Sequence, residues 1–220
     1  MNRNQLISKR IFDVCVSFVG IILLLFPGCI IYFAIKSSSK GPAFFHQIRI
    51  GQWGKPFMCI KFRTMTTGAN HLGTVTTLND PRIMTIGKFL RKYKLDELPQ
   101  LWNVFVGKMS FVGPRPDVAG YADKLSGEDR KILELKPGIT GPASLYFRDE
   151  ERILAEKENP KEYNDTVLWP KKIKLNLEYY ENWSFWKDIG YILITVFPIF
   201  DKILKLVPNQ DLEFSSRSTT

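Results

Sequence analysis

The chain has 220 residues, enough for one domain of ordinary size with a short appendage, and this length argues against a multidomain protein. Hydrophobic residues make up 45% and charged residues 24%, as in globular proteins, so a disordered chain, a collagen-like repeat and a polytopic membrane protein are disfavoured. The net charge of +9 comes from residues 36–120, where thirteen Lys or Arg face four acids; such a segment predicts an anionic partner, with a merely solvated cationic face as the alternative.

The first predicted element is a long apolar helix. Val14–Ile35 contains 22 consecutive residues without a charge, and at about 1.5 Å per residue such a helix is long enough to cross a bilayer core. The run is too long for the apolar region of a cleaved signal and is followed by a poor cleavage site. Residues 1–40 are therefore predicted to be a retained membrane anchor.

The topology of this anchor is suggested by its flanks. Lys9 and Arg10 precede the apolar run and Lys36 and Lys40 follow it, and cationic flanks favour the cytoplasmic side of a membrane. Pro27 lies near the centre, where it removes a backbone donor and its ring clashes with the preceding turn. We therefore expect a re-entrant helix hairpin, broken near Pro27, with both ends in the cytoplasm; a kinked straight span is the alternative.

Residues 41–220 are predicted to form one cytoplasmic domain that begins with a β-hairpin. Its strands are expected over Phe44–Ile50 and Phe57–Met65, joined by a glycine-containing turn. Because side chains alternate between the two faces of a strand, Lys61 and Arg63 should project side by side. Two adjacent cations are compatible with an anion site or with an ordinary solvated face.

The next segment combines cations with an isolated pair of acids. Ile86–Lys94 is predicted to be a helix that carries four cations, and apolar residues recur at helical spacing over Leu98–Phe105. Asp96 and Glu97 therefore lie at a helix entrance, where neighbouring cations should keep a carboxylate ionised. Such a carboxylate suits a nucleophile or a metal ligand, although a surface ion-pair cluster explains the same residues.

The C-terminal third predicts further helices. The apolar stretch Ile189–Phe200 is too short to cross a bilayer, and aromatic and lysine side chains crowd the approach to it. This mixture is typical of interfacial amphipathic helices lying in the head-group layer, and ordinary core packing is the alternative. The predicted fold class is thus mainly α with a small β-hairpin (α+β), associated with a membrane.

Phosphate binding is favoured by fixed cationic donors. Arg115 lies between two prolines, and together with the cations of the hairpin and of the following helix it suits a pyrophosphate. Neither a P-loop nor a glycine-rich dinucleotide motif is present in the sequence. A non-catalytic basic membrane-surface module that binds anionic lipid or nucleic acid is the competing hypothesis, and no RNA or DNA motif supports it.

Five short motifs occur together in a fixed order. They are Lys61-Phe62-Arg63-Thr64-Met65, Asp80-Pro81-Arg82, Leu95-Asp96-Glu97-Leu98-Pro99-Gln100-Leu101, Gly113-Pro114-Arg115-Pro116 and Lys136-Pro137-Gly138-Ile139-Thr140-Gly141. Behind an N-terminal hydrophobic segment, this series resembles the bacterial sugar transferases, also called monotopic phosphoglycosyl transferases, in their minimal catalytic form. The resemblance extends from about Lys9 to the region of Trp183.

The resemblance implies transfer of a sugar 1-phosphate from a UDP-sugar to a polyprenyl phosphate, usually undecaprenyl phosphate, with release of UMP. This reaction starts the assembly of a membrane-bound glycan. The family's Asp-Glu pair corresponds to Asp96 as the nucleophile, which would form an aspartyl phosphosugar, and to Glu97 as the partner of a Mg²⁺ ion that Asp96 would also contact. A single direct displacement is the alternative mechanism.

The resemblance also implies substrate contacts and a location. The residues expected to bind phosphate or nucleotide, or to line the site, are Lys61, Arg63, Arg91, Arg115, Pro116 and Arg148. The expected partners are the UDP-sugar donor, the polyprenyl phosphate acceptor and membrane lipids, with no nucleic acid and with a homodimer left open. The implied location is the bacterial inner membrane, with the catalytic domain on its cytoplasmic face.

Overall fold

The computed structural model describes residues 3–68 and 80–208, and over these ranges the chain is mainly helical with two small two-stranded sheets. The predicted fold class is confirmed to this extent. The α-helices are α1 (Arg3–Ser38), α2 (Thr85–Lys92), α3 (Gln100–Phe105), α4 (Pro142–Tyr146), α5 (Glu150–Ala155), α6 (Pro160–Tyr163), α7 (Trp169–Glu181), α8 (Phe185–Val196) and α9 (Asp201–Leu204). The strands are β1 (Phe44–Ile50), β2 (Pro56–Phe62), β3 (Ser110–Val112) and β4 (Gly138–Thr140). Short 3₁₀ segments cover Gln52–Gly54, Leu95–Glu97, Ala122–Lys124, Gly127–Glu134 and Pro198–Phe200, and Asn164–Leu168 forms a π-helical turn.

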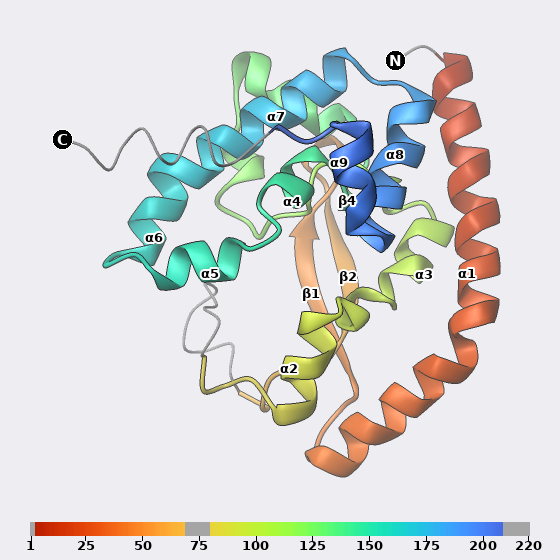
Figure 1. The fold of residues 1–220 in the computed structure, drawn as a ribbon, viewed down its shortest axis with the longest axis vertical. Helices are drawn as coiled ribbons and strands as arrows, with labels where there is room; N and C mark the ends of the chain where they lie inside the picture. Colours follow the sequence, from red (N-terminus) through yellow and green to blue (C-terminus); the bar gives the residue numbers. More distant parts are fainter. Residues whose placement is uncertain (1–2, 69–79, 209–220) are drawn as a thin grey trace.

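Helix α1 is continuous over 36 residues and runs along one side of the molecule (Figure 1). Pro27 lies inside it, and the orange C-terminal part of the helix bends away from the direction of the red N-terminal part (Figure 1). The predicted break near Pro27 is therefore corrected to a bend, because one proline removes a single backbone donor and the turns on either side keep their own hydrogen bonds. The described helix does not fold back on itself as a hairpin.

The polarity of α1 is inverted relative to a helix of a water-soluble protein. It is long and apolar enough to cross a membrane, with a mean hydropathy of 2.7 over its most apolar window, and only 6% of that window is buried. Its buried positions include Asp13 and Ser17, whereas its large exposed side chains are apolar apart from Arg3 and Lys36 near its two ends. The apolar ones are Leu6, Ile7, Ile11, Val16, Phe18, Val19, Ile22, Leu23, Leu25, Phe26, Ile30 and Phe33. A helix that turns polar groups inward and apolar groups outward is matched to an apolar solvent.

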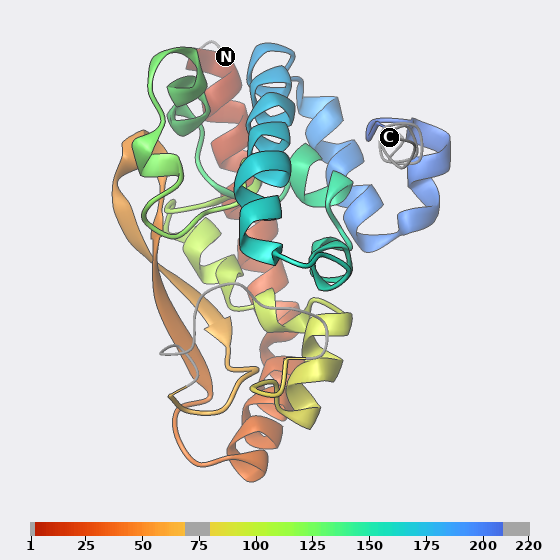
Figure 2. The ribbon, with the colours of Figure 1, turned by 90° about the vertical axis from the view of Figure 1, so that its left-hand side faces the viewer.

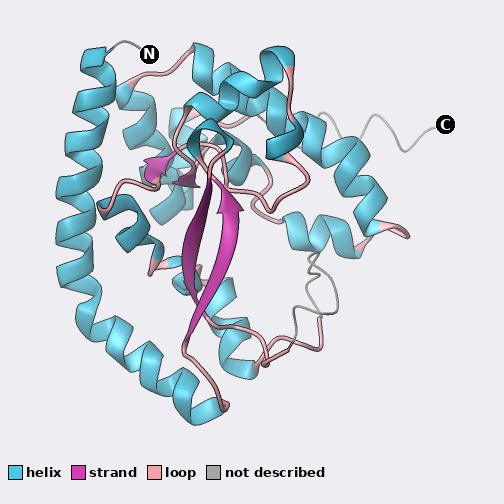
Figure 3. Cartoon of the chain, turned by 180° about the vertical axis from the view of Figure 1, so that it is seen from behind, coloured by secondary structure: helices cyan, strands magenta, loops and turns pink. Residues whose placement is uncertain are grey.

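Figure 3 shows the hairpin of β1 and β2 in front of the helices, and in Figure 2 it lies at one edge of the molecule. The two strands are antiparallel, with Phe44 opposite Phe62. The first strand has the predicted bounds, but the second ends at Phe62 rather than Met65. Beyond Phe62 the Arg63 N–H still donates to the Ala43 carbonyl at 2.8 Å. The buried Arg63 guanidinium donates to the carbonyls of Ser39 and Lys40, which follow the end of α1.

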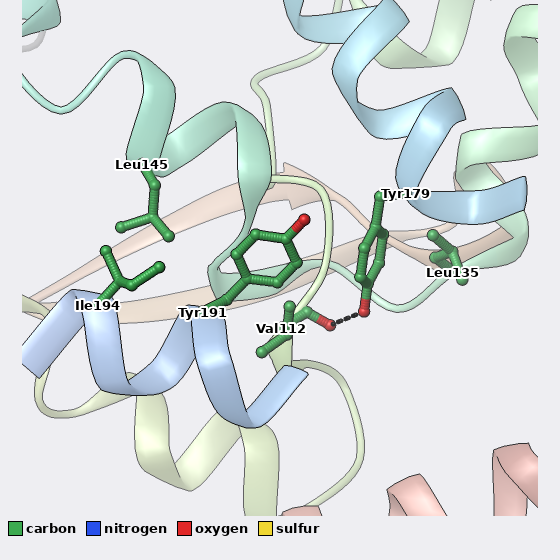
Figure 4. Close-up of a cluster of buried hydrophobic side chains, with 6 residues drawn as sticks. All are labelled: Val112, Leu135, Leu145, Tyr179, Tyr191 and Ile194. Carbon is green, nitrogen blue, oxygen red and sulfur yellow. Dashed lines mark hydrogen bonds between the residues drawn. The ribbon is translucent and has the colours of Figure 1, made fainter. Parts of the chain in front are cut away.

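A second sheet, parallel and formed by β3 and β4, was absent from the sequence-based prediction because three-residue strands carry no periodicity. It lies against a buried cluster made of Val112, Leu135, Leu145, Tyr179, Tyr191 and Ile194 (Figure 4). The Tyr179 hydroxyl donates to the Val112 carbonyl at 3.4 Å, which links α7 to β3 (Figure 4). This cluster supports the strand that leads into the Gly-Pro-Arg-Pro loop.

The C-terminal helices show the predicted core packing, while their placement in a head-group layer stays a prediction. The inner face of α8 carries Tyr191 and Ile194 into the core, as ordinary packing requires. Beyond it, exposed apolar side chains gather at the end of the described chain, including Phe197, Ile199 and Ile203. In Figure 2 this blue segment lies on the side of the molecule opposite the hairpin.

Gly87 of α2 packs closely on the backbone of Thr64, which follows the hairpin, and provides a stability test. A Cβ atom at this position would lie 2.1 Å from the Thr64 carbonyl oxygen, which is backbone and cannot rotate away. We expect Gly87→Ala to destabilise the fold by about 1–3 kcal/mol through overpacking, measured by chemical denaturation in detergent. Gly20→Ala is the matched control: its Cβ would meet only the flexible Leu101 side chain, at 3.2 Å, and it should cost much less. Equal stability of the two variants would contradict this packing.

Candidate active site

Two buried acids occupy the 3₁₀ turn Leu95–Glu97, which connects α2 to α3. Lys94 before the turn has a left-handed backbone conformation, with φ of 56°, and Pro99 precedes the first residue of α3. Asp96 and Glu97 are only 8% and 7% exposed. The prediction that these acids lie at a helix entrance is confirmed, whereas a surface ion-pair cluster is excluded by their burial.

Glu97 is held by two cations from different parts of the chain. Its Oε1 atom accepts hydrogen bonds from Lys61 Nζ at 2.8 Å and from Arg115 Nη2 at 2.6 Å. Burial alone would raise the pKa of Glu97, but Arg115 and then Lys61 outweigh it and hold the pKa well below its usual range. Glu97 is therefore an ionised carboxylate with its charge already compensated.

Asp96 has the opposite environment. Its Oδ1 atom is buried and has no hydrogen-bond partner among the described residues. Burial raises the pKa of Asp96 above its ordinary value, Lys61 opposes this shift, and the charge of Glu97 adds to it. The two acids thus differ in environment: Lys61 and Arg115 pair with Glu97, whereas burial is the largest influence on the pKa of Asp96.

The loop that carries Arg115 is rigid. Gly113 packs so closely on the neighbouring chain that a Cβ would lie 2.3 Å from the Lys136 carbonyl oxygen, and the Gly138 N–H donates to the Pro114 carbonyl at 2.8 Å. Prolines on both sides of Arg115 restrict the backbone further. The Arg115 side chain is 42% exposed, so it contacts Glu97 from an accessible position, while Pro116 is buried beside it.

Arg91 lies close enough to Asp96 for its charge to lower the pKa of that acid. One guanidinium nitrogen, Nη2, donates to Glu151 of α5 at 2.9 Å. The other, Nη1, is buried and has no partner among the described residues. An unpartnered buried donor near an unpartnered buried acceptor is the arrangement expected where an anionic substrate group would bind.

Two predicted substrate contacts are not brought to the acid pair. Arg63 shares a strand face with Lys61 in the sequence pattern, but it holds the chain after α1 through the carbonyls of Ser39 and Lys40. Arg148 donates to the Ile194 carbonyl of α8 at 2.9 Å. In the described structure both arginines bind backbone carbonyls and connect elements of the fold.

Asp117 was missed by the sequence analysis although it follows Arg115 by two residues. Burial raises its pKa to about 6, and the charges of Lys172 and Arg49 oppose that rise. Lys172 also pairs with Glu150 of α5 at 2.7 Å. The only sequence signal was the position of an acid within the proline-rich loop.

The fit of a Mg²⁺ ion follows from the donor set. No cluster of three or more His, Cys, Asp or Glu side chains that could hold a metal occurs within residues 3–68 and 80–208. Asp96 offers a free carboxylate oxygen, and Glu97 is its adjacent acid. Mg²⁺ typically binds one or two carboxylates together with waters and substrate phosphates. The site therefore fits a Mg²⁺ ion that is held largely by a phosphate-bearing ligand.

Comparison with known proteins gives consistent matches. The family model described as bacterial sugar transferase matches residues 4–202. The UDP-glucose:undecaprenyl-phosphate glucose-1-phosphate transferase of Klebsiella pneumoniae is 38% identical over 91% of this chain and 42% of its own length. The uncharacterised sugar transferase EpsL of Bacillus subtilis is 36% identical over 87% of this chain and 86% of its own. The undecaprenyl-phosphate galactose phosphotransferase of Salmonella typhimurium is 31% identical over 88% and 40%, respectively. The chain thus spans about two fifths of the length of the first and third relatives.

Proposed function

Because the chain belongs to the bacterial sugar transferase family, we propose that it transfers a sugar 1-phosphate from a UDP-sugar to a polyprenyl phosphate, such as undecaprenyl phosphate, and releases UMP. The observation that carries this proposal is that the two acids differ in their partners. Glu97 is bound by Lys61 and Arg115, while Asp96 keeps a free buried oxygen beside it. Cations suited to a diphosphate and an uncommitted carboxylate therefore meet at one place.

In the proposed reaction, Asp96 is the nucleophile. An oxygen of its carboxylate forms a bond to the β-phosphorus of the UDP-sugar, and the bond from that phosphorus to the bridging oxygen breaks. UMP leaves with the bridging oxygen, and the sugar phosphate remains on Asp96. A phosphate oxygen of the polyprenyl acceptor then attacks the same phosphorus and restores the carboxylate. Two displacements let a soluble donor and a lipid acceptor use one side chain in turn.

The surrounding charges assign the other roles. Arg115 and Lys61 would bind the diphosphate and stabilise the charge that develops on the departing UMP, and Arg91 offers its unpartnered Nη1 to the same phosphates. Glu97 keeps Arg115 and Lys61 in place. A Mg²⁺ ion held by the donor phosphates and by Asp96 or Glu97 would neutralise the diphosphate.

We also assign α1 as the membrane anchor. Its outward apolar face and inward polar face suit lipid on one side and the catalytic domain on the other. In this assignment the catalytic domain, which packs on the inward face of α1, lies on the cytoplasmic face of the inner membrane. Lys9 and Arg10 contribute less to this topology than expected, because both are paired within the protein.

Lys61 provides a pH test of the Asp96 assignment. Removing its charge should raise the pKa of Asp96, since Lys61 lowers it in the folded protein. A nucleophile must be deprotonated, so the acid limb of the kcat/KM profile should move upward in Lys61→Met, by about one pH unit for a nearby charge. Lys55→Met, at an exposed position in the same hairpin, should leave the limb in place. An acid limb that stays fixed or moves down in Lys61→Met contradicts the assignment.

The proposed function is tested with the purified full chain in detergent or nanodiscs. A panel of UDP-sugars is incubated with Mg²⁺ and undecaprenyl phosphate, and UMP and lipid-linked sugar are measured. Formation of both products from at least one donor is expected. If the folded protein releases no UMP from any donor, yet binds anionic vesicles equally well without Asp96 and Glu97, it is instead a non-catalytic membrane-surface module.

A further inference from the structure

The first turns of α1 contact both segments that form the active site. The Arg10 guanidinium donates to the carbonyls of Val104 and Phe105, each at 2.7 Å, at the C-terminal end of α3. The Val104 carbonyl also accepts from the Gly107 N–H at 3.0 Å, and a cation at the C-terminal end of a helix complements the helix dipole. Because α3 begins directly after the turn that holds the acid pair, Arg10 fixes one side of the site.

Three residues further along α1, Asp13 holds the other side. Its Oδ1 atom accepts from Ser110 Oγ at 3.2 Å and from the Phe111 N–H at 3.1 Å. Asp13 is 2% exposed, and Ser110 is fully buried. Since Ser110 and Val112 pair with β4, the Phe111 N–H faces the opposite edge of β3, where the Asp13 carboxylate takes the place of a third strand.

The short, rigid connection from β3 to Arg115 means that fixing β3 also fixes the backbone of Arg115. The Gly113 N–H donates to the Thr140 carbonyl at 3.0 Å, and the close packing of Gly113 and the bond to Pro114 leave the loop little freedom. The position of β3 along α1 therefore sets where the Arg115 guanidinium lies relative to Glu97. Arg10 and Asp13 are three residues apart and share one face of α1.

We propose that Arg10 and Asp13 are positioning residues, through which the apolar helix α1 keeps Arg115 in register with Glu97. The effect on donor binding rests on the proposed function, because it requires that Arg115 bind the diphosphate. A simple anchoring role would need only apolar contacts, whereas these two side chains contact the two segments that contribute the Glu97–Arg115 pair. Burying an acid on so apolar a helix costs free energy, and acids at such positions usually have a functional role.

The structural part of the proposal is tested by hydrogen–deuterium exchange, which requires no catalytic activity. Asp13→Leu removes the acceptor of the Phe111 N–H. The amides of residues 111–115 should then exchange at least about tenfold faster, which corresponds to a loss of about 1.4 kcal/mol in the free energy of local opening. Asp13→Asn retains an oxygen acceptor and should exchange like the parent. Ser17→Ala is the matched control, because Ser17 is equally buried on α1 but bonds only to Val14 of its own helix. Unchanged exchange in Asp13→Leu overturns the proposal.

The functional part is tested by a double-mutant cycle. Asp13→Leu should raise the KM for the UDP-sugar by about tenfold, and this effect should shrink to less than about threefold when Arg115 is already methionine, because the two residues then act on one contact. Retention of the full effect in the Arg115→Met background overturns the proposed positioning. If the parent protein has no activity while Asp13→Leu still changes the exchange, the proposed function fails and the structural link stands.

Discussion

Replacing Asp96 with asparagine is expected to reduce turnover by at least about a thousandfold, because the amide has nearly the shape of the acid but cannot form the bond to phosphorus. Asp96 Oδ1 has no hydrogen-bond partner among the described residues, so the substitution should leave thermal stability unchanged or raise it slightly. Donor turnover and the melting temperature are measured on the same preparation.

The control for this prediction is Asp165→Asn, the same chemical change at an acid that accepts a hydrogen bond from Tyr121 at 2.7 Å. This variant should keep its activity. Activity near the parent level in Asp96→Asn would remove the nucleophile from the proposed mechanism, because no other described carboxylate combines burial in this turn with an unpartnered oxygen.

Arg115→Met is expected to have the second largest effect. It removes the donor that lies 2.6 Å from Glu97 Oε1, and losing a donor to the diphosphate should lower kcat/KM for the UDP-sugar by at least about a hundredfold. The free energy of unfolding should fall by about 1–2 kcal/mol at neutral pH. This is the lower part of the range for a hydrogen bond between charged groups, because the Arg115 side chain is 42% exposed and water screens the pair.

The pH dependence identifies the source of this stability loss. The pKa of Glu97 is depressed in the folded protein, so its ion pair contributes fully above the unfolded-state pKa of about 4.3 and less as the pH falls below that value. The stability difference between the parent and Arg115→Met should therefore narrow below about pH 4.3. The double variant Glu97→Gln/Arg115→Met should regain stability without regaining activity. A stability loss that persists unchanged in the double variant would show that Glu97 is not the group left unpaired.

Local patterns in the sequence were sufficient for the hairpin and for the acid pair. The first strand, Phe44–Ile50, has its predicted bounds, since alternating side chains and a glycine-containing turn are local signals. Asp96 and Glu97 were placed at a helix entrance because apolar spacing and a proline mark the start of α3. These features depend on residues that are close in the chain.

Features that depend on distant segments were missed or misassigned. The pairing of Glu97 with Arg115, and the burial that raises the pKa of Asp96, arise from packing between elements far apart in sequence. Arg63 was placed with Lys61 by strand alternation, but its guanidinium instead donates to the carbonyls of Ser39 and Lys40 after α1, which strand alternation does not predict.

The inward face of α1 shows how a visible signal was overlooked. Arg10, Asp13, Ser17 and Gly20 recur at spacings of three and four residues, which defines one helix face. Helical periodicity is usually sought among apolar residues, whereas on this helix the polar and small residues form the packed face. Lys9 and Arg10 were interpreted as topology signals because they flank an apolar run. In the structure, Lys9 pairs with Asp188 and Arg10 donates to a carbonyl of α3.

Rapid quenching followed by intact-mass measurement tests the covalent step most directly. The purified protein is mixed with its UDP-sugar and Mg²⁺ in the absence of acceptor and then quenched over a series of times. We expect a mass increase of one sugar phosphate, located on Asp96 by peptide mapping, together with one UMP per enzyme. The adduct should disappear when undecaprenyl phosphate is added. Accumulation of lipid-linked product with no adduct at any quench time would contradict the two-displacement mechanism and indicate a single direct transfer.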